Sequence, residues 1–252
     1  MRTISHTLAL AGRSLTKTRR NPGILLDALF LPVLFLLLFV YLFGGAVAGS
    51  TRDYLQYIFP GVLMMAMIMT GMLATGVNLN YDIKKGVFDR FRSLPISRSA
   101  PLLGLVVGDL TRYVVALATL FGIGYLLGFR IGTHPLAALA AAGLATAFSF
   151  SLSWLSVFVG VLIREPVIVQ TVGFLGIFPL AFGTDMVAPA DTMPGWLQAW
   201  VDVNPVSHAL AATRGLLVGG PVAGPVLNTL LWSAGFVVVF APLAVAVYRR
   251  RV

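Results

Sequence analysis

Six long, nearly uncharged apolar runs constrain this sequence more than any other feature. They cover residues 24–44, 58–79, 110–129, 136–162, 166–186 and 225–247. A helix needs roughly 20 residues to cross about 30 Å of hydrocarbon, and these runs are close to that length or longer. The chain is 58% apolar with a mean hydropathy of +0.90, whereas soluble domains are roughly 45–50% apolar. We therefore predict an all-α polytopic membrane protein with six transmembrane helices, forming a single transmembrane domain over residues 1–252.

The basic residues lie mostly on one side of these predicted spans. Of 18 Lys and Arg residues, 15 lie before the first run, within residues 81–100, or at positions 112, 164 and 249–251. The other three are Arg52, Arg130 and Arg214. This asymmetry is the positive-inside bias, so we expect both termini of this multi-pass protein to be cytoplasmic. The net charge of +9 then reports topology and attraction to membrane lipids rather than nucleic-acid binding, because no basic groove with interleaved aromatic residues is present.

Two segments outside the spans have patterns of their own. In residues 1–23, Ile4, Leu8, Ala11 and Leu15 share one helical face, which predicts an N-terminal amphipathic interfacial helix; a disordered basic tail is the alternative. Residues 187–224 are apolar but interrupted by prolines and glycines. We predict short extracellular re-entrant helices there, before the last span.

Small and charged residues within the spans are interpreted as structural. Four-residue spacings of small residues predict close helix contacts at Gly71 with Thr75, at Gly124 with Gly128, and at Gly143, Ala147 and Ser151. Three charged residues, Asp27, Asp109 and Arg112, fall near the cytoplasmic ends of spans. We expect them to stand in water or lipid headgroups rather than in a buried functional site.

Residues 81–100 hold seven of the 27 charged side chains, between two uncharged stretches. Ile83, Val87, Phe91 and Leu94 form one helical stripe, with Asp82 at the expected start and Pro95 limiting the end. The pattern predicts a short amphipathic helix over 82–94 in a cytoplasmic turn. An ordinary solvated loop carrying topology charges is the alternative, although a loop has no need of the apolar stripe.

Two motifs resemble a known family. The stretch "IKKGVFDRFRSLPISRSAPLLG" is similar to the first cytoplasmic loop of permease subunits of type-2 ATP-binding-cassette exporters, and "DRFRSLPISRSA" looks most like daunorubicin/doxorubicin-resistance exporter permeases. The stretch "MPGWLQAWVDVNPVSHALAATRGLLVGG" is similar to the outer segment before the last span of that family. The resemblance covers essentially the whole chain. This sequence differs from many relatives just before the loop glycine. It has Lys84 and Lys85 there, whereas those relatives have Glu-Arg runs.

The resemblance implies that residues 82–94 form a coupling helix seated in a groove of a separate ATPase. The implied ATPase-coupling residues are Lys84, Lys85, Val87, Phe88, Asp89, Arg90, Phe91, Arg92, Leu94 and Pro95. It also implies a second permease, either this same chain or a paralogue. The chain has no G-x-x-x-x-G-K-[S/T] phosphate loop, so we expect a transport permease that is not an enzyme and has no cofactor, with ATP and Mg bound by the partner ATPase.

The expected function is ATP-driven export of a hydrophobic small molecule, either a drug, an antibiotic or a lipid. Flexible, polarizable methionines crowd the second span, and we predict Met65, Met69 and Met72 along the substrate path; ordinary packing is the alternative. A permease for cell-envelope glycans or lipid-linked polymers is a second reading. An ion-coupled secondary transporter is disfavoured because residues 58–79, 136–162 and 225–247 contain no carboxylate or histidine. The scattered histidines predict no metal site, and we identify no catalytic residue.

Overall fold

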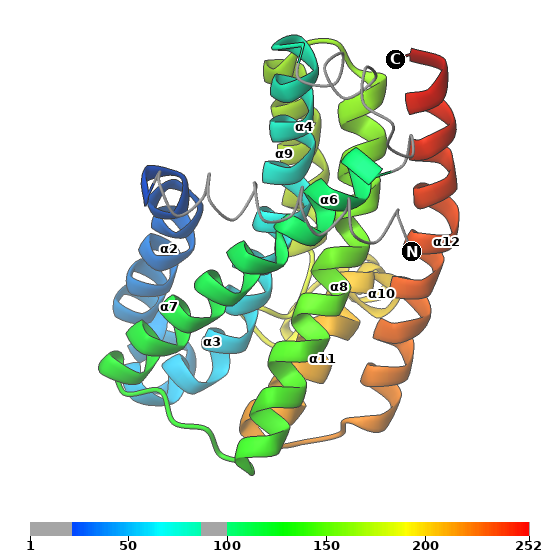
Figure 1. The fold of residues 1–252 in the computed structure, drawn as a ribbon. Helices are drawn as coiled ribbons and strands as arrows, with labels where there is room; N and C mark the ends of the chain where they lie inside the picture. The colour runs from blue at the N-terminus through cyan, green and yellow to red at the C-terminus, as the bar shows by residue number, and fades with distance from the viewer. Residues whose placement is uncertain (1–21, 87–99, 252) are drawn as a thin grey trace.

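A computed structural model describes residues 22–86 and 100–251, and within these ranges every regular element is a helix (Figure 1). The elements are α2 (Pro22–Ala48), α3 (Thr51–Ile68), the π-helix η1 (Met69–Ala74), α4 (Thr75–Lys84), α6 (Ala100–Gly108), α7 (Leu110–Leu127), α8 (Pro135–Leu162), α9 (Pro166–Phe182), the 3₁₀-helix η2 (Ala190–Thr192), α10 (Gly195–Val203), α11 (Pro205–Val218) and α12 (Ala223–Arg251). The predicted all-α class is confirmed for the described residues. The N-terminal amphipathic helix predicted over 1–23 falls almost entirely outside them.

Four helices are long and apolar enough to cross a membrane. They are Thr51–Lys84, Gly104–Leu127, Pro135–Leu162 and Ala223–Tyr248. Two further apolar helices, Phe30–Ala46 and Pro166–Phe182, are shorter. Every predicted span therefore coincides with an apolar helix, while the number that crosses the bilayer stays a prediction.

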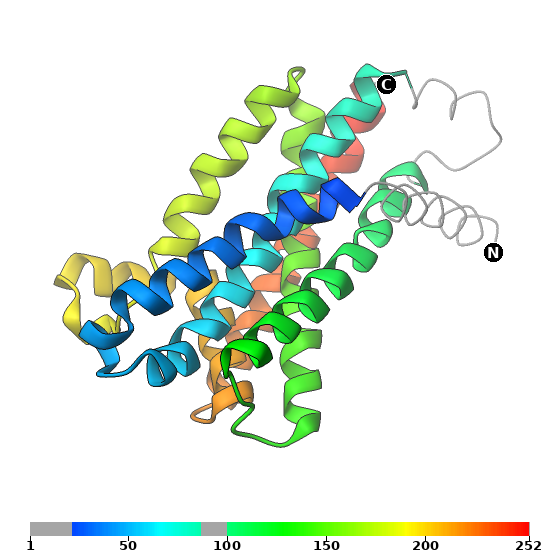
Figure 2. The same cartoon turned by 90° about the vertical axis from the view of Figure 1, so that its left-hand side faces the viewer.

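One long helix runs through the centre of the bundle. Ser50 caps its start by accepting a hydrogen bond from the Asp53 amide (3.0 Å), and α3, η1 and α4 then continue without a loop to Lys84. Of its most apolar window, 83% is buried inside the bundle. Helices α2 and α7 lie on one side of it and α8 and α12 on the other, as both ribbon views show (Figures 1 and 2). The central position explains why an uncharged sequence suits this helix best.

The outer helices present apolar side chains to their surroundings. Only 11% of the α12 window is buried, and Leu126, Leu175 and Val238 are 86%, 73% and 70% exposed. A soluble monomer rarely exposes apolar surface on this scale. Lipid or a second membrane subunit is the environment that such a surface suits.

Small residues allow η1 and α4 to approach α8 closely. A Cβ atom added at Gly71 would lie 2.5 Å from the Ser149 carbonyl oxygen, and one at Gly160 would lie 2.6 Å from the carbonyl oxygen of Gly76. The prediction of a close contact is confirmed for Gly71. It is wrong for Gly143, which has open space around it, and for Gly128, which ends α7 with a left-handed φ of 108°. Small residues serve several roles, and spacing alone does not separate them.

The segment before α12 folds into short helices, as predicted for residues 187–224. Helix α10 carries Trp196 and Trp200 on its exposed side, whereas α11 packs against α3, α8 and α12. Pro194 is the N-cap of α10, and Pro205 is the first residue of α11. Re-entry of these helices into the outer leaflet stays a prediction.

Candidate functional site

The cytoplasmic turn predicted to couple to an ATPase begins at the end of α4. Lys84 is the last residue of this helix, and Gly86 follows in a left-handed turn with φ of 66°. The expectation that Asp82 starts a separate helix is wrong, because Asp82 lies in the last turn of α4, which continues without a break from the central helix. Of the predicted coupling residues, eight lie outside the described ranges: Val87, Phe88, Asp89, Arg90, Phe91, Arg92, Leu94 and Pro95.

The end of α4 is attached to the turn between α8 and α9. Lys84 Nζ lies 2.6 Å from Glu165 Oε2, and both side chains are about half exposed. One turn deeper, Asn80 Nδ2 donates to the carbonyl oxygens of Gly160 (2.9 Å) and Ile163 (2.6 Å). The two turns at this end of the bundle are thus connected, and Glu165 is a site residue that sequence reasoning missed. No local spacing signals this partner.

A buried ion pair lies deeper in the bundle, at the break between α6 and α7. Asp109 and Arg112 are 1% and 6% exposed, and Arg112 Nη1 donates to Asp109 Oδ1 (2.8 Å). Thr75 at the start of α4 donates to Asp109 Oδ2 (2.5 Å). The expectation that Asp109 and Arg112 stand in water or headgroups is therefore wrong. Both groups are buried, and their pairing and the Thr75 hydrogen bond offset part of the loss of hydration.

The π-helix η1 is held by polar groups of α8. Ser156 Oγ donates to the Met72 carbonyl oxygen and accepts from the Gly76 amide (2.8 Å). π-Helical segments depart from the regular hydrogen-bond pattern and are often found at functional sites. Ser156 thus satisfies backbone groups where the central helix changes its winding.

The three methionines predicted on a substrate path occupy two environments. Met65 is 2% exposed and belongs to the core, whereas Met69 and Met72 are partly buried against it. A Cβ atom added at Gly176 of α9 would lie 3.0 Å from the Met72 methyl carbon, so Met72 faces α9. Their place along a substrate path stays a prediction.

The opposite end of the bundle carries a second set of polar contacts. Arg214 of α11 forms an ion pair with Asp185, and its guanidinium lies 4.3 Å from the Tyr57 ring centroid. Tyr57 donates to the Asp185 carbonyl oxygen (2.6 Å). Asn204 Nδ2 donates to the carbonyl oxygens at the end of α9, Leu180 (2.9 Å) and Gly183 (2.8 Å). These contacts fix the short helices to α3 and α9.

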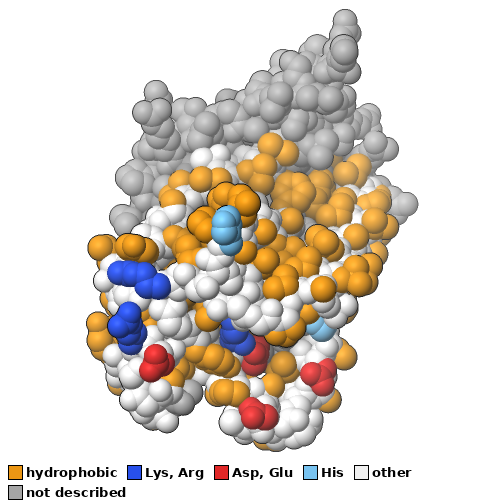
Figure 3. All heavy atoms as spheres, turned by 90° about the horizontal axis from the view of Figure 1, so that it is seen from below, with side chains coloured by type: hydrophobic (Ala, Val, Ile, Leu, Met, Phe, Trp, Pro, Cys, Tyr) orange, Lys and Arg blue, Asp and Glu red, His pale blue; other side chains and the backbone are white. Residues whose placement is uncertain are grey.

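Charge is sparse at this end. Figure 3 shows it from below, with a few basic and acidic side chains among apolar and uncharged ones. Arg130 belongs to the same end as Arg214, because the Gly132 amide donates to the Leu217 carbonyl oxygen of α11 (2.9 Å). Lys84 and Glu165 mark the other end. Among the described residues, Lys84 therefore lies at the opposite end from Arg130 and Arg214, and which end faces the cytoplasm stays a prediction.

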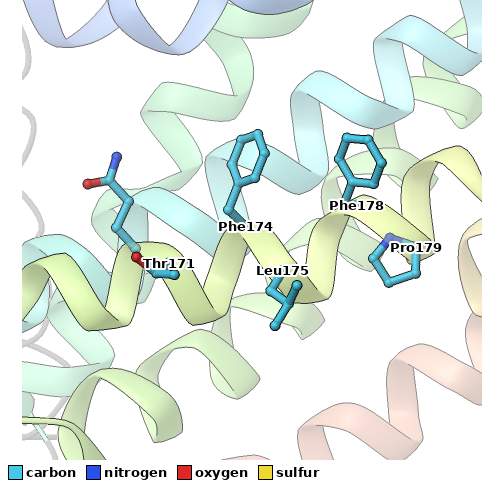
Figure 4. A pocket seen from close by; sticks show the side chains of 6 residues that line it. Thr171, Phe174, Leu175, Phe178 and Pro179 are labelled. Carbon is cyan, nitrogen blue, oxygen red and sulfur yellow. The ribbon is translucent and has the colours of Figure 1, made fainter.

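A groove of ≈ 690 Å³ lies along α9. Its lining consists of Gln170, Thr171, Phe174, Leu175, Phe178 and Pro179. Phe174 and Phe178 point to the same side of the helix, and their ring centroids are 6.4 Å apart (Figure 4). An apolar surface with aromatic side chains and one or two polar groups is typical of sites for small hydrophobic molecules. Among the described residues, no group of three or more His, Cys, Asp or Glu side chains is placed to hold a metal ion.

Comparison with known proteins gives consistent matches. Residues 5–218 match the family described as ABC-2 type transporter. The chain is 44% identical over 248 residues to the daunorubicin resistance ABC transporter permease protein DrrB1 of Streptomyces coeruleorubidus, covering 98% of this chain and 87% of that protein. It is 29% identical over 248 residues to the probable doxorubicin resistance ABC transporter permease protein DrrC of Mycobacterium tuberculosis, covering 98% and 89%. A putative transport permease of Cyanophora paradoxa, ycf38, is 26% identical over 84% of this chain and 73% of its own length.

Proposed function

The chain belongs to the ABC-2 type transporter family, and we propose that it is the transmembrane permease of an ATP-driven exporter that moves a hydrophobic small molecule out of a bacterial cell. The similarity to a daunorubicin resistance permease along 98% of the chain carries this proposal. The apolar surface of the outer helices supports it, because a permease presents such a surface to lipid and to a second permease.

We propose that all six apolar helices cross the membrane. Helices α2 and α9 are 27 and 17 residues long and supply the two spans beyond the four long ones. Six crossings place both termini on one side, together with the end of α4 and the α8–α9 turn. The excess of Lys and Arg on that side supports a cytoplasmic assignment.

A separate ATPase binds at the cytoplasmic end in this proposal and supplies ATP and Mg. In this proposal Phe88 and Phe91 act as aromatic anchors, and Lys84, the last residue of α4, precedes them in sequence. The Lys84–Glu165 pair joins this turn to the α8–α9 turn, so both move together when the ATPase closes. Two permeases complete the unit, and the surface of α9 or α12 is available for the second.

The α9 groove is the described surface that best suits a planar apolar substrate, whereas Met72 is not part of its lining and contacts α9 at Gly176. Replacing Met65, Met69 and Met72 together by Ala tests the predicted path. The matched control replaces Met64 and Met67, which are 1% and 0% exposed in the same helix. We expect the first variant to lose substrate-stimulated ATP hydrolysis and the control to retain it. Equal substrate stimulation of ATP hydrolysis in both variants would contradict the prediction that these methionines line the substrate path, but it would not contradict the export proposal.

Transport into inside-out membrane vesicles tests the function directly. Vesicles containing this chain and its ATPase should accumulate daunorubicin, seen as fluorescence quenching, when ATP and Mg are added. A variant ATPase without its phosphate-loop lysine should abolish accumulation. Accumulation that follows a proton gradient without ATP would overturn the proposal in favour of a secondary transporter. ATP-dependent movement of a lipid-linked saccharide, with no accumulation of daunorubicin, would instead support the glycan or polymer exporter.

A further inference from the structure

A small pocket lies where α2, α3 and α7 meet, at the end of the bundle that we assign to the outer side. It has a volume of ≈ 330 Å³ and is lined by Val40, Tyr41, Thr51, Arg52, Leu127, Gly128 and Arg130. Two of the three basic residues predicted on this side of the membrane thus share one pocket. The drug-export function makes no use of them.

Arg130 is held in place by its own surroundings. Its guanidinium lies 3.9 Å from the Tyr125 ring centroid, and Nη1 donates to the carbonyl oxygens of Tyr125 (2.8 Å) and Phe129 (2.8 Å). Its hydrogen bonds from the side chain to described residues all use Nη1. The other guanidinium nitrogens therefore remain for a ligand, on a group whose orientation is already fixed.

Arg52 lies at the start of α3 and is exposed, with no hydrogen bond or ion pair to any described residue. The nearest acidic residue in sequence, Asp53, is not part of the pocket lining, and its Oδ2 accepts a hydrogen bond from Ser50 Oγ (2.6 Å). Two guanidinium groups thus line one pocket without a carboxylate in the lining. This arrangement repels cations and favours an anion, and a planar guanidinium binds phosphate oxygens through two parallel hydrogen bonds.

The rest of the lining indicates where the anion comes from. Val40, within α2, and Leu127, the last residue of α7, form the apolar part of the lining, and Tyr41 is 68% exposed beside them. Tyrosine is enriched at the level of lipid headgroups. A phosphate attached to acyl chains satisfies both halves of this lining, whereas a free phosphate satisfies only the basic half.

We infer that Arg52 and Arg130 form a binding site for the phosphate group of an anionic phospholipid in the outer leaflet. Thr51 supplies a hydroxyl group at the start of α3, and the acyl chains lie along Tyr41 and Leu127. The lipid is a bound partner of the permease and not its transported substrate. The inference therefore depends on the assigned topology and not on drug export.

Lipid binding to the purified full-length chain in a mild non-ionic detergent tests this site. Native mass spectrometry gives the dissociation constants for phosphatidylglycerol and for phosphatidylcholine. We expect wild-type protein to prefer phosphatidylglycerol, and Arg52→Gln to weaken phosphatidylglycerol binding about tenfold, the effect expected for loss of hydrogen bonds to a charged group. Arg52→Gln leaves the hydrogen bonds of Arg130 at the end of α7 intact, so a folding defect is not expected. Arg52→Lys keeps the charge and should weaken binding less.

The matched control is Arg164→Gln, which removes one exposed positive charge from the opposite end of the bundle. It should leave the preference for phosphatidylglycerol unchanged. The inference is overturned if Arg164→Gln and Arg52→Gln weaken binding equally, or if wild-type protein binds both lipids alike. In a second experiment, inorganic phosphate at millimolar concentration is added as a competitor for phosphatidylglycerol. Displacement of phosphatidylglycerol by phosphate would also overturn the lipid assignment, because it would show a site for a free anion.

Discussion

Replacing Asp109 by Ala tests whether the buried ion pair holds the centre of the bundle together. The Asp109 carboxylate accepts hydrogen bonds from Arg112 (2.8 Å) and from Thr75 (2.5 Å), and so connects α7 to the central helix. At 1% and 6% exposure, neither Asp109 nor Arg112 is hydrated. The substitution removes the negative charge and leaves the Arg112 guanidinium buried without it.

The expected effect is large, because removing one partner of a buried pair leaves an uncompensated charge. Such substitutions destabilise proteins by about 3–5 kcal/mol. In a chain of this size, 1 kcal/mol shifts the midpoint of thermal unfolding by roughly 2–4 °C. We therefore expect Asp109→Ala to lower the thermal midpoint by about 10 °C, apart from any effect on transport.

The midpoint is measured by heating samples in detergent to a series of temperatures for the same time and following the loss of the native peak in size-exclusion chromatography. Asp202→Ala is the matched control, because Asp202 is an exposed carboxylate on α10, and its removal should change the midpoint little. A midpoint for Asp109→Ala equal to that of the control would refute the reasoning. Such a result would mean that water or another anion compensates the charge of Arg112 when Asp109 is absent.

A double variant separates the charge from the packing. Asp109→Leu combined with Arg112→Met removes both charges and keeps apolar volume, and buried pairs replaced in this way are often no less stable. We expect this double variant to regain most of the stability lost in Asp109→Ala. A double variant as unstable as Asp109→Ala would show that the loss comes from packing and not from an unpaired charge.

Three further predictions concern the cytoplasmic end. Phe88→Ala combined with Phe91→Ala should weaken ATPase binding by about 2 kcal/mol or more, roughly thirtyfold, without preventing membrane insertion; co-purification of a fully coupled ATPase would contradict this. Arg90→Cys in this naturally cysteine-free chain should react with an impermeant thiol reagent only in opened cells, and labelling of intact cells would reverse the topology. Glu165→Gln should destabilise the protein by only about 0.2–1 kcal/mol, because its pair with Lys84 is half exposed, yet lower coupled transport; unchanged coupling would show that the pair is structural.

Hydrophobic length predicted the helices well and their ends less well. The run over 136–162 differs by one residue from α8, because His134 and Pro135 start the helix and Ile163 ends it in an extended conformation. The run over 58–79 is shorter than the central helix, which begins at Thr51 and includes charged residues near both ends. Composition marks where a helix is apolar, whereas capping by Ser50 and the turn at Gly86 determine where it begins and ends.

Long-range pairing was beyond a single sequence. Asp109 and Arg112 are three residues apart, so their proximity follows from helix geometry, but their burial depends on the neighbouring helices. Thr75 is 34 residues from Asp109, and Glu165 is 81 residues from Lys84. Spacing rules act within one or two helical turns. Neither partner follows from them.

The central helix connects the two ends of the permease. Tyr57 near its start donates to the segment fixed by Arg214, and Lys84 at its end pairs with Glu165. A helix hydrogen-bonded along its length transmits a displacement of one end unless it bends where that bonding is irregular. In the described residues of this helix, the bonding is irregular at η1, which Ser156 of α8 supports from the side, and at Pro60, which has no amide hydrogen to donate. A movement imposed at Lys84 reaches η1 first, beside Met69 and Met72, and is either absorbed there or carried past Pro60 to the contacts at the outer end.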